Sequence, residues 1–200
     1  VYRAHVRGLT KHASSGTEHR GTFRGIVDKI PYLKELGITT LELLPVVEFQ
    51  EVMMPENVEG NPYGSSEPTG RLNYWGYTKA GMFAPKASYA DPGMSPVTEF
   101  KYMVRELHRA GLEVVPELYF SGKEVPEFVL ETVRFWVREY HVDGIHLTGY
   151  APVDLLAKDP YLADTKLWAI SWDAPKPSAG EKKHLGEYND GFLIDMRRAL

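Results

Sequence analysis

The chain has 200 residues, of which 43% are hydrophobic, and its formal net charge at pH 7 is −4. Length and composition suit one globular domain with a substantial core, and we expect a single domain over residues 1–200. The mild negative charge and the lack of long basic runs argue against nucleic acid and anionic membranes as partners. The sequence has no cysteine, which excludes disulfides and thiolate metal sites, and no apolar run reaches 18 residues.

The sequence begins at Val1, with no methionine and no signal-like segment ahead of it. We therefore expect a piece of a longer chain. We favour the cytoplasm as its location and leave the compartment open.

Strand and helix patterns alternate from the start. We expect a short strand over residues 2–8, a helix over 25–36 that stops at Gly37, and a buried apolar strand over 38–47. A loop of nearly thirty residues follows, rich in proline, glycine, asparagine and glutamate. Loops of this length inside a compact domain are usually functional or disordered.

The second half repeats the alternation. Ser95 and Pro96 predict the start of a helix that runs to about residue 110, since serine caps helices and proline suits their first turn. The further expected elements are a strand over 112–120, a helix over 126–140, a strand over 142–148, a short helix over 152–161, a strand over 166–171 and a helix from 189. Five such units indicate an α/β fold, either a (β/α) barrel or a doubly wound sheet. No glycine-rich phosphate fingerprint follows a strand, which disfavours the nucleotide-binding version.

Three aromatic rings close the long loop, in the segment Asn73-Tyr74-Trp75-Gly76-Tyr77. The C–H face of a sugar ring stacks on such rings and leaves its hydroxyls free to hydrogen-bond. Clusters of tyrosine and tryptophan also often only anchor a loop, with buried bodies and hydrogen-bonded tips. We retain Tyr74, Trp75 and Tyr77 as candidate sugar-binding residues.

Further stretches extend this signal along nearly the whole chain. The most specific runs from Asn73 to Tyr77 and continues to Phe83-Ala84-Pro85; others lie at residues 1–10, 37–46, 142–144, 166–173 and 187–198. In this order they resemble the α-amylase superfamily of glycoside hydrolases, in its glycogen-debranching, isoamylase and pullulanase branch. The resemblance implies an α-glucan oligosaccharide as ligand. It also implies a TIM-type barrel, here a partial barrel of about five βα units, with its site at the carboxyl ends of the strands.

The catalytic positions of that family depart from its pattern. Retaining glycosidases use two carboxyl groups about 5–5.5 Å apart, one as nucleophile and one as acid/base. The resemblance places Thr148 at the nucleophile, Ile170 at the acid/base and His146 at the arginine that steadies the nucleophile. Threonine has no positioned base in this motif and isoleucine cannot transfer a proton. The sequence therefore predicts no catalytic residue and an inactive domain.

The third strand is altered as well. The resemblance places Glu117 at an aspartate, and Ser121 and Gly122 at an asparagine and a histidine, which makes the family's frequent calcium site doubtful. Residues 121–125 replace a large excursion that walls the cleft in the family, so we expect a shallower cleft.

Three functions stay open. The first is an inactive, degenerate barrel with weak α-glucan binding. The second is an active glucan-cleaving enzyme that recruits other acids, for which the candidates are Glu113, Glu117, Asp143 and Asp173. Of these, Glu113 is expected to point outward and Asp143 to lie at the amino end of its strand, which leaves Glu117 and Asp173 near the right end. The third is a structural or interaction module of a larger protein.

We expect neither a cofactor nor a metal ion, because no pair of histidines shows ligand spacing with a carboxylate. Five strand–helix units cannot close an eight-stranded barrel. We therefore expect the strands that begin at Tyr2 and Lys166 to be edges, covered by the remainder of a longer chain or by a second copy in a homodimer.

Overall fold

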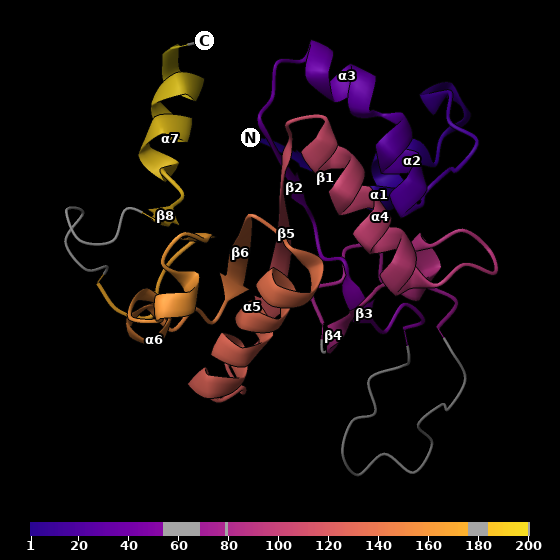
Figure 1. Cartoon of the computed structure of the whole chain (residues 1–200). Helices are drawn as coiled ribbons and strands as arrows, with labels where there is room; N and C mark the ends of the chain where they lie inside the picture. Colours follow the sequence, from indigo (N-terminus) through magenta and orange to yellow (C-terminus); the bar gives the residue numbers. More distant parts are fainter. Residues whose placement is uncertain (54–68, 79, 176–183, 200) are drawn as a thin grey trace.

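The structure is a computed structural model that describes residues 1–53, 69–78, 80–175 and 184–199. Six strands form one sheet in the order β1 (Tyr2–Ala4), β2 (Thr40–Leu43), β5 (Glu113–Phe120), β6 (Gly144–Gly149), β7 (Lys166–Ala169) and β8 (Leu185–Glu187). Each neighbouring pair is parallel. The strands of this sheet follow one another in chain order, so the expected partial (β/α) barrel is confirmed (Figure 1).

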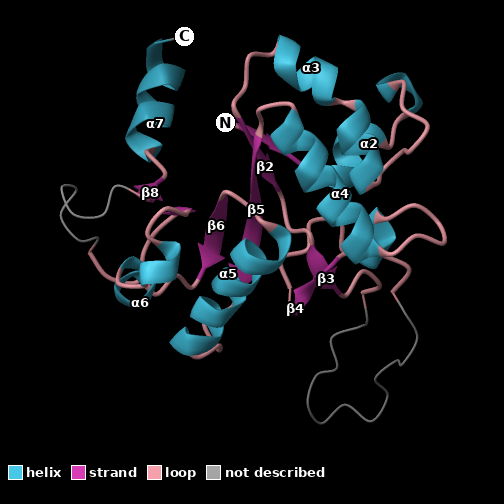
Figure 2. Ribbon diagram, viewed as in Figure 1, coloured by secondary structure: helices cyan, strands magenta, loops and turns pink. Residues whose placement is uncertain are grey.

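Helices follow most of these strands (Figure 2). The principal ones are α2 (Phe23–Asp28), α3 (Ile30–Glu35), α4 (Pro96–Arg109), α5 (Pro126–Tyr140), α6 (Val153–Ala157) and α7 (Asp190–Ala199). Single 3₁₀ turns lie at Ala13–Ser15, Ala87–Tyr89 and Pro160–Leu162. Ser95 caps α4 as predicted, because its hydroxyl accepts the backbone N–H of Thr98. Within the described residues, no helix is both long enough and apolar enough to cross a membrane.

The strand expected over residues 2–8 is wrong beyond Ala4. A short helix, α1 (Val6–Thr10), takes its second half. His5 begins this helix, since its Nδ1 accepts the backbone N–H of Gly8 at 3.0 Å and so satisfies a free donor of the first turn.

The helix expected over residues 25–36 is two helices that meet at Lys29. Pro31 stands in the first turn of α3, where its missing N–H is harmless, whereas inside one long helix its ring would clash with the preceding turn. The strand expected over 38–47 also divides. β2 ends at Leu43, and β3 (Val47–Phe49) forms a separate antiparallel pair with β4 (Ala80–Pro85), a strand that the sequence did not predict.

The sheet edges differ from expectation at one side. β1 pairs with β2 and with no other described strand, as predicted for an edge strand. The prediction that the strand beginning at Lys166 is the other edge is wrong, because β7 also pairs with β8. Loop residues 54–68 and residues 176–183, which precede β8, lie outside the described part of the chain.

The two faces of the sheet have opposite chemistry. Side chains alternate along a strand, so each strand sends every second residue to each face. One face carries apolar residues that pack with α4 and α5, among them Leu41, Val114, Ile145 and Leu167. The register places Arg3 beside Glu42 and Glu117 beside His146 on the other, inner face. Buried polar groups cost free energy unless they are hydrogen-bonded, so this inner face must hold a polar network.

Candidate functional site

The inner face of the sheet holds two buried carboxylates bridged by one guanidinium. Arg3 reaches Glu42 through Nε at 2.9 Å and Glu117 through Nη2 at 2.5 Å. His146 Nδ1 lies 2.9 Å from the same Glu42 oxygen and 3.9 Å from Glu117. These four residues come from four adjacent strands, so the cluster is a product of the parallel register.

Hydroxyl groups surround the two carboxylates. Tyr188 donates to Glu42 at 3.0 Å, and the Tyr77 hydroxyl accepts a hydrogen bond from Arg3 at 3.0 Å. Burial and the neighbouring carboxylates raise the pKa of both tyrosines, which therefore keep their protons at neutral pH. The aromatic residue Tyr77, predicted to meet sugar, thus lies against the inner cluster.

Thr148 lies at the carboxyl end of β6, where the resemblance places the nucleophile. Its hydroxyl donates to Glu117 at 2.5 Å. The expectation that Thr148 has no positioned base is therefore wrong, because a neighbouring strand supplies a carboxylate. Glu117 at the same time accepts a hydrogen bond from Arg3, so each of its two oxygens has a partner.

Ile170 follows β7 directly, with 51% of its surface exposed and no polar side-chain atom. The nearby Asp173 accepts the backbone N–H of Val153 at 2.9 Å and so caps α6. After β5, Glu124 accepts from the Ser121 hydroxyl and the Gly122 N–H, which closes the short connection on itself.

The other candidate acids lie at the opposite end of the sheet. Asp143 precedes β6, as predicted, where it contacts His108 and accepts the backbone N–H of Val114. Glu113 begins β5 and pairs with Lys166. The expectation that Glu113 points outward is wrong, since strand alternation places it on the same face as Glu117.

Two of the predicted aromatic residues form one exposed surface. Tyr74 stacks on His5 with ring centroids 4.1 Å apart and an interplanar angle of 6°. Trp75 stands perpendicular to Tyr74 and is 56% exposed. Tyr77 instead packs edge-on against Tyr119 at 5.9 Å. The structure therefore brings Tyr74 and Trp75 together and separates Tyr77 from them.

The loop that carries these rings has a fixed turn. The Asn73 side chain accepts the Gly76 N–H at 3.1 Å and donates to the carbonyl of Gln50 at 3.2 Å. Gly76 has φ +83°, and a Cβ there would lie 2.7 Å from the ring of Phe49. Only glycine fits both the left-handed backbone and the close contact.

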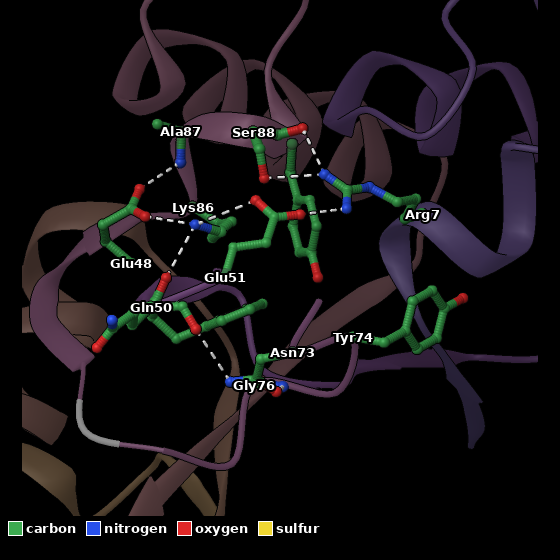
Figure 3. Close-up of polar contacts among 12 residues, drawn as sticks. Arg7, Glu48, Gln50, Glu51, Asn73, Tyr74, Gly76, Lys86, Ala87 and Ser88 are labelled. Atoms are coloured by element: carbon green, nitrogen blue, oxygen red, sulfur yellow. Dashed lines mark hydrogen bonds and ion pairs between the residues drawn. The ribbon is translucent and has the colours of Figure 1, made fainter. Parts of the chain in front are cut away.

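Four charged side chains lie beside this loop (Figure 3). Lys86 is buried and reaches Glu48 at 2.5 Å, Glu51 at 3.6 Å and the carbonyl of Phe49 at 2.9 Å. Arg7 from α1 also pairs with Glu51. We call Arg7, Glu48, Glu51 and Lys86 the loop network, because they join α1 to the β3–β4 hairpin on which the aromatic loop rests.

No family profile matches the chain. Curated relatives include the chloroplastic isoamylase SU1 of Zea mays, 30% identical over 257 residues, which takes in 87% of this chain and 31% of the relative. The glycogen debranching enzyme of Escherichia fergusonii is 30% identical over 99% of this chain and 38% of its own length. The chain thus spans about a third of these relatives.

Solved structures agree on the fold. A pullulanase type I from Bacillus subtilis str. 168, complexed with maltose, superposes with a TM-score of 0.69 at 22% identity, over 96% of this chain and 35% of that one. A pullulanase from Paenibacillus barengoltzii, in complex with maltohexaose and α-cyclodextrin, gives 0.70 at 22% identity, over 95% and 39%. The chain is therefore homologous to the isoamylase, glycogen-debranching and pullulanase branch of the α-amylase superfamily, glycoside hydrolase family 13.

Proposed function

We propose that this α-glucan hydrolase-like domain binds glucan weakly and does not hydrolyse it. The observation that carries the proposal is the pair of side chains at the ends of β6 and β7. Thr148 and Ile170 stand there, and hydrolysis with retention needs two carboxyl groups in that region.

The nearby carboxylates have other partners. Glu117 is buried between Arg3 and Thr148, and Asp173 caps a helix. Both carboxylates are therefore already engaged by groups of the protein itself, which leaves fewer of their oxygen atoms available to a substrate. This supports an inactive site rather than one that has recruited new acids.

Glucan binding rests on Trp75 and Tyr74. Their rings offer stacking faces, and pullulanases of the same fold hold maltose and maltohexaose in their structures. The alignment with the Zea mays isoamylase extends over 257 positions but takes in only 87% of the 200 residues of this chain, so the relative carries extra residues within the shared segment. A shorter segment is consistent with a shallower substrate cleft than in the relative. In a shallow cleft, each stacked ring contributes only about 1 kcal/mol to the free energy of binding.

Titration with maltoheptaose, together with reducing-sugar assays on glycogen and pullulan, tests this function. We expect weak binding that Trp75→Ala weakens about fivefold, and no sugar release above buffer. Lys101→Met serves as the matched control, since Lys101 lies in an exposed pair with Glu139. Absence of any binding would favour a purely structural module.

An active enzyme is the second candidate, and the hydrogen bond from Thr148 to Glu117 is the observation that favours it. In that case Glu117→Gln would remove a measurable hydrolytic rate. Reproducible hydrolysis that is lost in this variant would replace our proposal.

For the sheet edges we propose that the remainder of a longer chain covers β1 and β8. Support comes from the relatives, of which this chain spans only 31% and 38%. A stable homodimer of the 200-residue chain in analytical ultracentrifugation would favour the second-copy alternative.

A further inference from the structure

We propose that His5 is the positioning residue of the exposed surface formed by Tyr74 and Trp75, and that only its neutral ring holds this surface in place. We call Tyr74 and Trp75 the glucan platform. The inference rests on the proposed glucan binding, because it names the group that orders the binding rings. Short-range spacing could not reveal this contact, since 69 residues separate His5 from Tyr74.

The imidazole of His5 supports the glucan platform from inside the molecule. It is stacked on the Tyr74 ring with centroids 4.1 Å apart, and the Trp75 ring stands perpendicular to it at 6.0 Å. His5 is 8% exposed, whereas Tyr74 is 39% and Trp75 56% exposed. A buried ring therefore fixes two rings that remain accessible to a ligand, and stacking on a sugar needs such fixed rings.

Hydrogen bonds engage both nitrogens of the imidazole. Nδ1 accepts the backbone N–H of Gly8 at 3.0 Å, so the proton of the neutral ring is on Nε2. Nε2 then donates to the backbone carbonyl of Tyr74 at 2.8 Å, and the Tyr89 hydroxyl lies 3.2 Å from the same nitrogen. The ring therefore joins α1 to the aromatic loop through its two nitrogens and through its face.

Gly8 leaves the space that the Tyr74 ring needs beside α1. A Cβ at residue 8 would lie 2.7 Å from the Tyr74 hydroxyl and 3.3 Å from the Cβ of His5. The Tyr74 side chain thus extends from the imidazole to the first turn of the helix that His5 caps. The cap and the glucan platform consequently depend on the same histidine.

The groups around His5 do not favour a charged ring. Arg7, on the same helix, is cationic and is paired with Glu51 of the hairpin. Burial raises the pKa of Tyr89, so this hydroxyl keeps its proton, and the loop presents the face of Tyr74. Within the described part of the chain, no carboxylate forms an ion pair with His5.

A second proton on His5 removes the arrangement. A protonated Nδ1 cannot accept from Gly8, so two N–H donors would face each other across 3.0 Å. Burial also lowers the pKa of His5 from its ordinary value of 6.5. The glucan platform is therefore held above pH 6.5 and loses its support as pH falls through the folded-state pKa of His5.

Calorimetric titration with maltoheptaose at pH 7.5 and at pH 5 tests this role. We expect the wild-type affinity to fall about threefold between the two, because the rings lose their fixed position. His5→Asn retains a capping side chain but lacks the ring, so it should bind about threefold more weakly than wild type at pH 7.5 and show no further loss at pH 5.

His12→Asn is the matched control. His12 also caps a turn, because its Nδ1 accepts the backbone N–H of Ser14, but it is exposed and lies outside the glucan platform. This variant should keep the affinity and the pH dependence of the wild type. The proposal is overturned if wild type and His5→Asn show the same affinity at pH 7.5 or the same change with pH, or if His12→Asn behaves like His5→Asn.

A second measurement needs no sugar. Fluorine NMR of protein labelled with fluorotryptophan reports the surroundings of Trp75, and Trp75→Phe identifies its signal. We expect this signal to shift between pH 7.5 and 5 in wild type and in His12→Asn, and to stay constant in His5→Asn. A signal that is constant in wild type, or that shifts equally in His5→Asn, overturns the proposal. Failure of maltoheptaose to bind at pH 7.5 would contradict glucan binding, and the fluorine titration would then decide the role of His5.

Discussion

The loop network and the inner-face cluster each centre on two glutamates, but they differ in how their charges are balanced. Arg7 and Lys86 supply two cations to Glu48 and Glu51, and Lys86 also donates to a backbone carbonyl. In the inner cluster, Arg3 is the one arginine or lysine that contacts Glu42 and Glu117 within the described part of the chain, and His146 lies beside both carboxylates. The loop network therefore holds a loop through two cations, whereas the inner cluster joins four strands through one arginine and several hydrogen bonds.

The largest effect is expected where the balanced network loses a buried charge. Lys86→Met leaves Glu48 without its cation and Glu51 with Arg7 as its remaining cation among the described residues, and should lower the free energy of unfolding by about 3 kcal/mol. Urea denaturation measures this loss. Lys101→Met, at an exposed ion pair, should leave the midpoint unchanged, and an equal shift in both variants would contradict a special role for Lys86.

The next largest effect is expected at the fixed turn at Asn73 and Gly76, which lies beside the loop network. Gly76→Ala adds a Cβ into the Phe49 ring at a residue with φ +83°, and should cost about 2–3 kcal/mol. Gly93→Ala is the matched control, since Gly93 has φ +80° and open space around it. In thermal unfolding, the melting temperature of Gly76→Ala should be clearly lower than that of Gly93→Ala. Equal melting temperatures would show that the contact with the Phe49 ring is unimportant.

A smaller, pH-dependent effect is expected at His5. Burial lowers its pKa from the ordinary value of 6.5, and the neutral ring accepts from Gly8 and stacks on Tyr74. The stabilisation is therefore complete above pH 6.5 and is lost as pH falls through the folded-state pKa.

Urea midpoints between pH 7.5 and 5 measure this loss. In His5→Asn, which retains a capping side chain, the slope over this range should become flatter. An unchanged slope would assign the pH dependence to other groups.

The smallest effect concerns sugar. Trp75→Ala should weaken maltoheptaose binding about fivefold, because one stacking face is lost. Tyr77→Phe should change binding little, since its hydroxyl contacts Arg3. Titration measures both affinities. A larger loss of affinity in Tyr77→Phe than in Trp75→Ala would place the binding surface beside the inner cluster.

The sequence was sufficient for the parallel order of the strands, because long apolar runs alternate with helical patterns at regular spacing. It missed β4, which has six residues, and β8, which has three, because neither segment has a strong alternating pattern. Pro31 was a readable sign that the helix over 25–36 is divided.

The sites were harder to predict than the fold. The aromatic segment is contiguous in sequence and was identified, but the inward turn of Tyr77 depends on Arg3, 74 residues away. His146 and Glu42 are separated by 104 residues, and Thr148 and Glu117 by 31. Such contacts follow from strand register, which short-range spacing does not encode.

The central claim is that the site has lost its nucleophile, and α-maltosyl fluoride tests it most directly. Fluoride leaves without a proton, so this substrate bypasses the acid missing at Ile170 and depends on the group at Thr148. We predict that fluoride release by the wild-type chain equals release by Thr148→Val. The account would be contradicted if the wild-type chain released more fluoride than Thr148→Val, or more than Glu117→Gln.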